Sequence, residues 1–282
     1  MRKHNEKIVR GLLIGISIVF FLLMLVLPLI EVLYRALKDG WETYSKALTA
    51  EYTLSALKVT MIATLFAVAV NTFFGIIAAW LSTKFDFKGK NVLLTLIDIP
   101  FSISPVIVGL AYIMTFGRSG WAMPLVSKIN DLLGTDISFV FSVPGVVLVT
   151  IFVTFPFISR EIIPILNAEG RDEEIAAAQM GASGFTIFRK ITFPHIKWGV
   201  FYGMILCAAR AFGEFGAVYA VSKARGKTFT LPLEIDALYM AGSADSITQA
   251  FAVSSLLVGM ALIMLVLKNI IEYRGKRKNL DN

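Results

Sequence analysis

Residues 171–194 read RDEEIAAAQMGASGFTIFRKITFP, the longest polar-rich passage between the hydrophobic runs of this chain. The acids Asp172–Glu174 come first, and a helix N-terminus favours negative charge because its N–H groups have no intrahelical partner. The alanine-rich run 176–180 consists of strong helix formers, and Gly181 supplies a C-terminal stop. The passage therefore predicts a short helix that ends just before Gly181.

The second half of the same passage predicts another short helix. Ser183 is a suitable N-cap, and Arg189 and Lys190 are favourable near a helix C-terminus. Pro194 lacks a backbone N–H, so we expect the helix to end before it. Two short helices joined by a sharp corner between hydrophobic runs indicate a rigid docking surface. An amphipathic helix pair that lies in the membrane interface is the alternative.

The composition is that of a membrane protein. The 282 residues are 56% hydrophobic and only 17% charged, with a mean hydropathy of +0.73. The apolar residues lie in six runs, each long enough to cross a hydrocarbon layer of about 30 Å. These runs are Gly11–Ile30, Val59–Leu81, Val92–Phe116, Phe139–Ile158, Trp198–Ser222 and Ile247–Leu267. We therefore expect an all-α integral membrane protein with six transmembrane helices in one domain, residues 1–282.

The distribution of Lys and Arg predicts the orientation. Most of these residues fall on one side of the expected spans, in segments 2–10, 84–90, 160–197 and 268–278. Basic loops stay in the cytoplasm, so both termini and residues 171–194 are expected there. The net charge of +7 is accounted for by topology and anionic lipid, without a nucleic-acid site.

The third expected span carries the first unusual features. Pro100 and Pro105 each remove a backbone donor, and Asp98 lies near the inner third of the span. A helix broken at membrane depth is tolerated where it faces protein or a water-filled cavity. Ser102 and Ser104 place hydroxyls beside this break. These five residues either line a translocation path or form a kinked packing helix, and both interpretations stay open.

The fifth expected span combines small residues with two charges. Gly199 and Gly203 form a GxxxG motif, which permits close helix packing. Arg210 and Glu214 are four residues apart, so they can pair on one helical face. Arg210 is the one arginine expected inside a span. It either locks helices together with Glu214 or presents a cation to a passing anion, which would make both residues part of the path.

Three further features bear on chemistry. Cys207 is the only cysteine and lies inside a span, so no internal disulfide is expected. The two histidines are far apart in the sequence, and the spans lack paired carboxylates or a nucleophile–base motif, so we expect neither a metal site nor catalysis. Gly226–Thr228 resembles the end of a phosphate-binding loop, but position 221 is Val rather than Gly. No cofactor is expected in this chain.

The spacing within residues 171–194 resembles the EAA loop of bacterial ABC-importer permeases. The residues that carry the resemblance are Ala176, Ala177, Gly181, Ile191 and Pro194. The family's usual glutamate before the alanines is replaced by Ile175, and Glu174 stands one position earlier. The resemblance implies that residues 171–194 form the cytoplasmic coupling loop, which docks on a separate ATPase through these residues and Glu174.

Three other segments resemble the permeases of sulfate and thiosulfate importers, nearest the W-type subunit, and less closely those of molybdate importers. They are Ile97–Leu110, Ala209–Val218 and Thr230–Tyr239. The resemblance implies a type I ABC-importer permease architecture in the bacterial inner membrane. It also implies three partners: a T-type permease subunit, an ATPase dimer that binds ATP and Mg²⁺, and an extracytoplasmic sulfate-binding protein.

Two alternatives remain at this point. The cargo of such an importer could be molybdate or tungstate, because the GEFGA stretch within Ala209–Val218 is common to both branches. A protein of another class, an ATP-independent anion channel or carrier, would also have charged and kinked spans, but it would not need a coupling loop.

Overall fold

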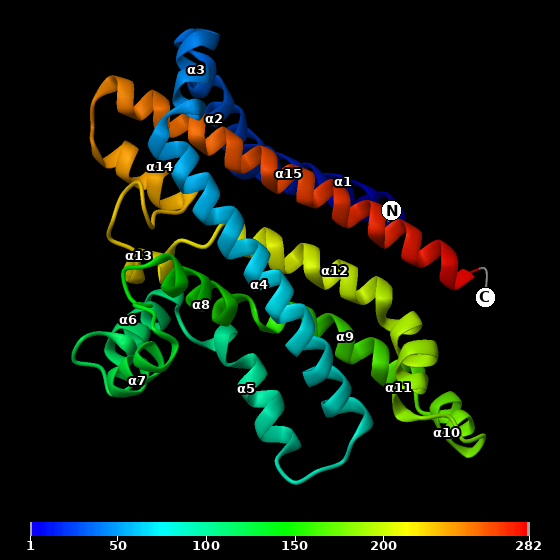
Figure 1. Ribbon diagram of the computed structural model, residues 1–282. Helices are drawn as coiled ribbons and strands as arrows, with labels where there is room; N and C mark the ends of the chain where they lie inside the picture. Colours follow the sequence, from blue (N-terminus) through cyan, green and yellow to red (C-terminus); the bar gives the residue numbers. More distant parts are fainter. Residues whose placement is uncertain (1, 281–282) are drawn as a thin grey trace.

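The computed structural model describes residues 2–280, and within them every regular element is helical. Figure 1 shows long helices lying roughly side by side, with short helices at both ends of the bundle. The elements in chain order are α1 (Arg2–Phe21), η1 (Leu22–Val26), α2 (Leu27–Leu37), α3 (Gly40–Thr49), α4 (Glu51–Lys84), α5 (Lys90–Ser102), α6 (Pro105–Phe116), α7 (Met123–Leu133), α8 (Val143–Thr154), α9 (Pro156–Glu169), α10 (Asp172–Gln179), α11 (Gly184–Ile187), η2 (Phe188–Thr192), α12 (Phe193–Phe212), α13 (Gly216–Val221), α14 (Leu231–Met240) and α15 (Ala244–Leu280).

The expected membrane spans are largely confirmed. Among the described residues, four continuous helices are long and apolar enough to cross a membrane: Val9–Leu37, Glu51–Lys84, Val143–Glu169 and Ala244–Arg274. They correspond to the first, second, fourth and sixth predicted spans. The third predicted span is α5 followed by α6, and the two helices are bent by 109° at the break. Counting that pair as one span gives five.

The fifth predicted span is not one continuous helix. Helix α12 ends at Phe212, Gly213 forms its C-cap, and α13 begins at Gly216. The sequence Gly-Glu-Phe-Gly at this point combines flexible and polar residues, which weakens a helix inside an apolar environment. The expected count of six spans is therefore not confirmed exactly: the described residues give four continuous candidate spans, or five with the bent α5–α6 pair, and α12 with α13 takes the place of the predicted fifth span.

Small and polar side chains fix the contacts between the central helices. An added Cβ at Gly199 would lie 2.3 Å from Ile165 Cδ1, and one at Gly203 would lie 3.0 Å from Ile158 Cα, so α12 packs tightly on α9. On α4, buried Asn71 donates hydrogen bonds from Nδ2 to two groups of α8: the Ile151 carbonyl (3.1 Å) and Thr154 Oγ1 (2.9 Å). The GxxxG motif thus has the packing role that its spacing predicts.

The first helix lies at the edge of the bundle. No residue in the most apolar part of Val9–Leu37 is buried, although α2 lies against α15. Figure 1 shows the start of α1 and the end of α15 toward the same end of the molecule as α10. The segment between the first two predicted spans forms α3 and the first turns of α4.

Residues 171–194 form α10 and α11 as expected, but Pro194 does not end the second helix. Ser183 Oγ accepts a hydrogen bond from the Thr186 N–H (3.3 Å), which confirms the predicted cap. The helix then continues through η2 into α12, with Pro194 in the first turn of α12. The wider π-helical turn shifts the hydrogen-bond register just before the proline, so the missing N–H is accommodated without a break.

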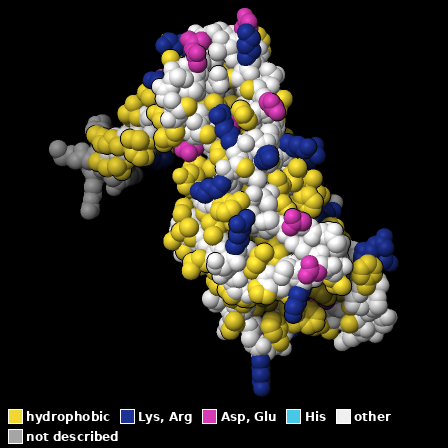
Figure 2. Space-filling model, turned by 60° about the vertical axis from the view of Figure 1, so that its left-hand side comes forward, with side chains coloured by type: hydrophobic (Ala, Val, Ile, Leu, Met, Phe, Trp, Pro, Cys, Tyr) yellow, Lys and Arg dark blue, Asp and Glu magenta, His cyan; other side chains and the backbone are white. Residues whose placement is uncertain are grey.

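The end of the molecule opposite α10 is formed by α3, α6, α7, α13 and α14 (Figure 1). Figure 2 brings part of this end forward and shows Lys and Arg side chains scattered among hydrophobic ones. The segment that follows α6 at this end contains α7. Arg225 and buried Glu234 form a forked ion pair at this end, with Nη2 2.6 Å from Oε1 and Nε 3.0 Å from Oε2.

Gly109 allows α6 to lie against α13, and this contact is testable. An added Cβ would be 2.5 Å from the Ala217 carbonyl oxygen and 2.6 Å from Ala220 Cβ. We expect Gly109→Ala to lower the stability of the folded protein by about 1–3 kcal/mol, because the backbones must separate. The control is Gly259→Ala in α15, where the added Cβ meets nothing within 4 Å. Thermal unfolding in detergent measures the stability of both variants. Equal unfolding midpoints for Gly109→Ala and Gly259→Ala would contradict the close α6–α13 contact.

Candidate functional site

The first candidate site is the 171–194 segment, which connects α9 to α12 at one end of the bundle (Figure 1). Acidic residues occupy the first turn of α10, where they complement the helix dipole. Gly181 has φ +85°, a left-handed conformation that glycine adopts without strain, and it turns the chain from α10 toward α11. The predicted first helix and its stop are confirmed.

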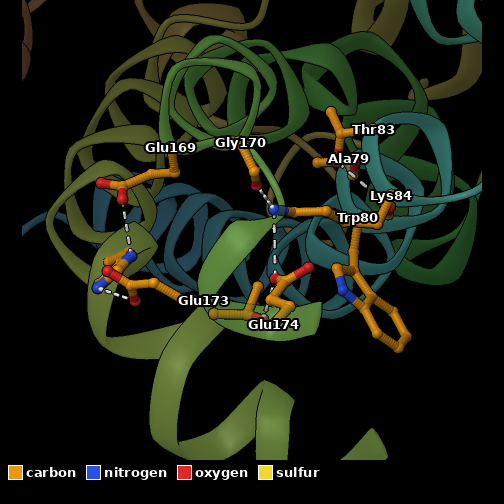
Figure 3. A network of polar contacts seen from close by, with 10 residues as sticks. Ala79, Trp80, Thr83, Lys84, Glu169, Gly170, Glu173 and Glu174 are labelled. Atoms are coloured by element: carbon orange, nitrogen blue, oxygen red, sulfur yellow. Dashed lines mark hydrogen bonds and ion pairs between the residues drawn. The ribbon is translucent and has the colours of Figure 1, made fainter. Parts of the chain in front are cut away.

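Glu174 points inward and anchors this segment to the bundle. Its Oε1 lies 3.2 Å from Lys84 Nζ at the end of α4 and accepts a hydrogen bond from Thr192 Oγ1 at 2.6 Å. Lys84 Nζ also donates to the Gly170 carbonyl (Figure 3). The Lys84 and Glu174 side chains are only 6% and 17% exposed, so this is a nearly buried ion pair. One carboxylate therefore ties α10 to both α4 and η2.

A second set of contacts fixes the start of α10. His195 in α12 has Nδ1 2.8 Å from Glu169 Oε2 and Nε2 3.6 Å from Glu173 Oε2. Figure 3 shows Glu169 and Glu173 beside the Glu174 network. Within the described part of the chain, no group of three or more His, Cys, Asp or Glu residues is arranged to hold a metal ion. These contacts therefore brace the segment against α9 and α12.

The outer face of the same segment is apolar and uncovered. Ile175, Met180 and Phe185 are 50%, 82% and 75% exposed. A groove of about 330 Å³ lies between α10, α11 and the end of α4, with Ile175 and Trp80 among its lining residues. Of the remaining predicted coupling residues, Ala177 is buried, Ala176 and Gly181 are exposed, and Ile191 and Pro194 are half-buried. Ile175, which replaces the expected glutamate, is on the exposed side.

The second candidate site lies where two helix breaks meet. Ser102 and Ser104 are exposed at the bend between α5 and α6, Pro100 is buried in the last turns of α5, and Pro105 starts α6. An added Cβ at Gly216 would lie 3.3 Å from Pro105 Cβ, so the start of α13 touches the start of α6. The structure therefore brings the breaks of the third and fifth predicted spans together.

Arg210 and Glu214 form the predicted pair, but across a break and not on a continuous helix. Arg210 Nη1 is 2.5 Å from Glu214 Oε2, and the side chains are 32% and 1% exposed. Glu214 Oε1 also accepts a hydrogen bond from the Ala217 N–H at 2.8 Å, in the first turn of α13. Glu214 thus satisfies a free backbone donor on one side of the break and holds Arg210 on the other.

Asp98 has a partner that the sequence interpretation missed. Arg160 Nε lies 2.8 Å from Asp98 Oδ1, and the two side chains are 51% and 46% exposed. We expected Arg160 beyond the end of the fourth span, but the helix continues through α9 to Glu169. Arg210 is therefore not the only arginine within a span. The apolar residues of 162–166, which follow Arg160, were the signal that the span runs on.

Comparison with known proteins places the chain among transport permeases. Residues 71–278 match the family described as the binding-protein-dependent transport system inner membrane component. The chain is 40% identical over 267 residues to a Synechocystis protein named sulfate transport system permease protein CysW, with 94% of each chain covered. The Escherichia coli K12 protein of the same name is 41% identical over 263 residues, which cover 93% of this chain and 87% of the relative.

The fold agrees with solved importers. A bacterial ABC transporter that imports the polysaccharide alginate has a chain with a TM-score of 0.75 and 17% identity, covering 98% of this chain and 99% of its own. A complex of the alginate transporter with its pentasaccharide-bound periplasmic protein gives a TM-score of 0.76, again at 17% identity, covering 97% and 96%. The chain belongs to the family of inner membrane components of binding-protein-dependent transport systems, and its fold is that of an ABC-importer permease.

Proposed function

We propose that this chain is the W-type permease subunit of an ATP-driven sulfate/thiosulfate importer in the bacterial inner membrane. The observation that carries the proposal is the identity of about 40%, over more than nine-tenths of this chain, with proteins named as sulfate permeases. The broken helices and the intramembrane ion pairs supply groups that a divalent oxyanion would need in a low dielectric.

The 171–194 segment is the proposed contact with a separate ATPase, which would bind ATP and Mg²⁺. Its inner face is tied down by Glu174, and its outer face exposes Met180 and Phe185. An exposed apolar surface on a rigid support is typical of a protein interface. This contact, and the excess of Lys and Arg toward this end, would place both termini in the cytoplasm.

Two further partners complete the proposed importer. A T-type permease subunit would cover the faces of α5 and α9 that carry the exposed Asp98–Arg160 pair. An extracytoplasmic binding protein would deliver sulfate at the opposite end, formed by α6, α7, α13 and α14 (Figure 1). The alginate transporter, which has the same fold, has been solved with its own periplasmic protein bound.

The proposed path runs past the two helix breaks. Arg210 would offer positive charge, and Ser102 and Ser104 would offer hydroxyl donors beside the α5–α6 bend. Helix α6 begins at this bend, so its first N–H groups also face the break. Pro100 and Pro105 hold the bend open, Glu214 positions Arg210, and Asp98 balances charge. Because two of these groups are acids, selectivity would lie largely with the external binding protein.

Uptake by a reconstituted complex tests the proposed function. The complex would contain this chain, its second permease and its ATPase in proteoliposomes, with binding protein loaded with sulfate, thiosulfate or molybdate. We expect sulfate-loaded protein to stimulate both ATP hydrolysis and anion uptake. If only the molybdate-loaded protein stimulated both, the cargo would be molybdate and the ATP-driven mechanism would still hold. Uptake without ATP would favour the alternative, an anion channel or carrier.

A charge on the exposed face of α10 tests the coupling surface. We expect Met180→Glu to reduce co-purification of the ATPase about tenfold or more, because the interface would have to bury an unpaired carboxylate. Met180 is 82% exposed, so the change leaves the permease fold intact. The control is Leu132→Glu on α7 at the opposite end, where Leu132 is 84% exposed. Equal ATPase recovery with both variants would rule out docking through this face.

Neutralising the Arg210–Glu214 pair tests the path. Removing Arg210 alone would leave buried Glu214 without its counter-ion, which destabilises proteins. The double variant Arg210→Gln/Glu214→Gln keeps a hydrogen-bond acceptor for the Ala217 N–H. We expect it to assemble normally and to lose uptake by about tenfold or more, because a hydrogen bond from a charged donor has been lost. Wild-type uptake by an assembled double variant would remove Arg210 from the path.

A further inference from the structure

The Asp98–Arg160 pair lies well inside the helices that carry it. Asp98 is eight residues into α5 from Lys90, and Arg160 is nine residues before the end of α9 at Glu169. At about 1.5 Å per residue, both are about 12–14 Å from the helix ends at the α10 end of the bundle. Both residues therefore lie two turns or more inside their helices, and Asp98 stands between the start of α5 and the α5–α6 break that follows Ser102.

The pair is also incompletely satisfied and open to its surroundings. The recorded contact uses Arg160 Nε and one Asp98 oxygen, and about half of each side chain is exposed. Arg225 and Glu234 provide a contrast, because both oxygens of that carboxylate take part and it is only 1% exposed. A guanidinium has five N–H donors in a fixed fork, so Arg160 retains capacity for a further acceptor.

Lipid cannot be the neighbour of these exposed groups. Ionisable side chains at membrane depth face the interior of a bundle or a water-filled cavity, since hydrocarbon does not solvate them. The described chain leaves this face of α5 and α9 uncovered. Another subunit, water or a transported ion must therefore complete it.

The pair lies next to the α5–α6 break. Arg160 Cζ is 4.5 Å from the ring centre of Phe101, and Phe101 immediately precedes exposed Ser102. The Phe101 ring also packs on Phe157 of α9, at 5.0 Å between ring centres, which fixes its position. The guanidinium thus lies over Phe101, the residue that directly precedes Ser102 at the break.

From these observations we propose that Arg160 is a second cation of the anion path, and that Asp98 is its counter-ion while the path is empty. The proposal deepens the proposed function and rests on it. A divalent tetrahedral oxyanion would accept hydrogen bonds from the free part of the Arg160 fork, while Asp98 limits how tightly the anion is held. Arg160 contacts the cargo directly, and Asp98 is a positioning residue.

The test is uptake by the reconstituted complex with three variants of the pair. Arg160→Gln removes the cation. Asp98→Asn/Arg160→Gln removes both charges and keeps hydrogen-bonding groups of similar shape. Arg160→Lys keeps the charge and loses the fork. The matched control is Arg35→Gln in α2, because Arg35 also pairs with an acid, Glu31, also lies over a phenylalanine ring, and is 52% exposed.

We expect Arg160→Gln and the double variant to assemble with the ATPase and to lose uptake about tenfold or more. Arg160→Lys should recover part of the rate, and Arg35→Gln should match the wild type. Wild-type uptake by the assembled double variant would show that the pair only holds helices together, and it would overturn the inference. The inference would also be overturned if Arg160→Gln and Arg160→Lys failed to assemble while the double variant assembled and took up anion normally. A wild-type complex that imports no oxyanion would instead refute the proposed function.

Discussion

Broken helices inside a membrane depend on finding partners for their free backbone groups, and this constraint organises the structure. Hydrocarbon offers no hydrogen bonds, so each break must lie against protein or water. The α5–α6 break and the α12–α13 break meet through Gly216 and Pro105, and Glu214 accepts from the Ala217 N–H. Each break is thus covered in part by the other.

The same helices connect the breaks to the other end of the molecule. Glu174 contacts Lys84 of α4 and Thr192 of η2, and η2 continues directly into α12. From Thr192 to Arg210 the chain rises about 27 Å along one continuous helix. A displacement of α10 would therefore be transmitted to Arg210 by a rigid element, because the nearly buried Glu174 contacts leave little room for slip.

Local chemistry predicted the elements better than the contacts between them. Apolar length predicted the spans, Ser183 the cap, Gly181 the turn, and Pro100 with Pro105 the broken third span. The residue Arg160 was misplaced because a charge was treated as the end of a span, although a charge is tolerated at depth when a distant helix supplies Asp98. Such pairing depends on tertiary packing and has no signature within one segment. The prediction that the helix ends before Pro194 was wrong for a similar reason, since the π-helical turn η2 depends on the hydrogen-bond register of the surrounding helix.

The charge balance of the two intramembrane pairs constrains any anion path through this chain. Asp98 and Glu214 each lie within contact distance of an arginine, so the empty break region is close to neutral. An incoming anion gains from the arginines but is repelled by the acids, and both interactions are strong in a low dielectric. The two pairs differ in burial: Glu214 is enclosed and accepts a hydrogen bond from a backbone donor, whereas Asp98 is half-exposed and has Arg160 as its ion-pair partner.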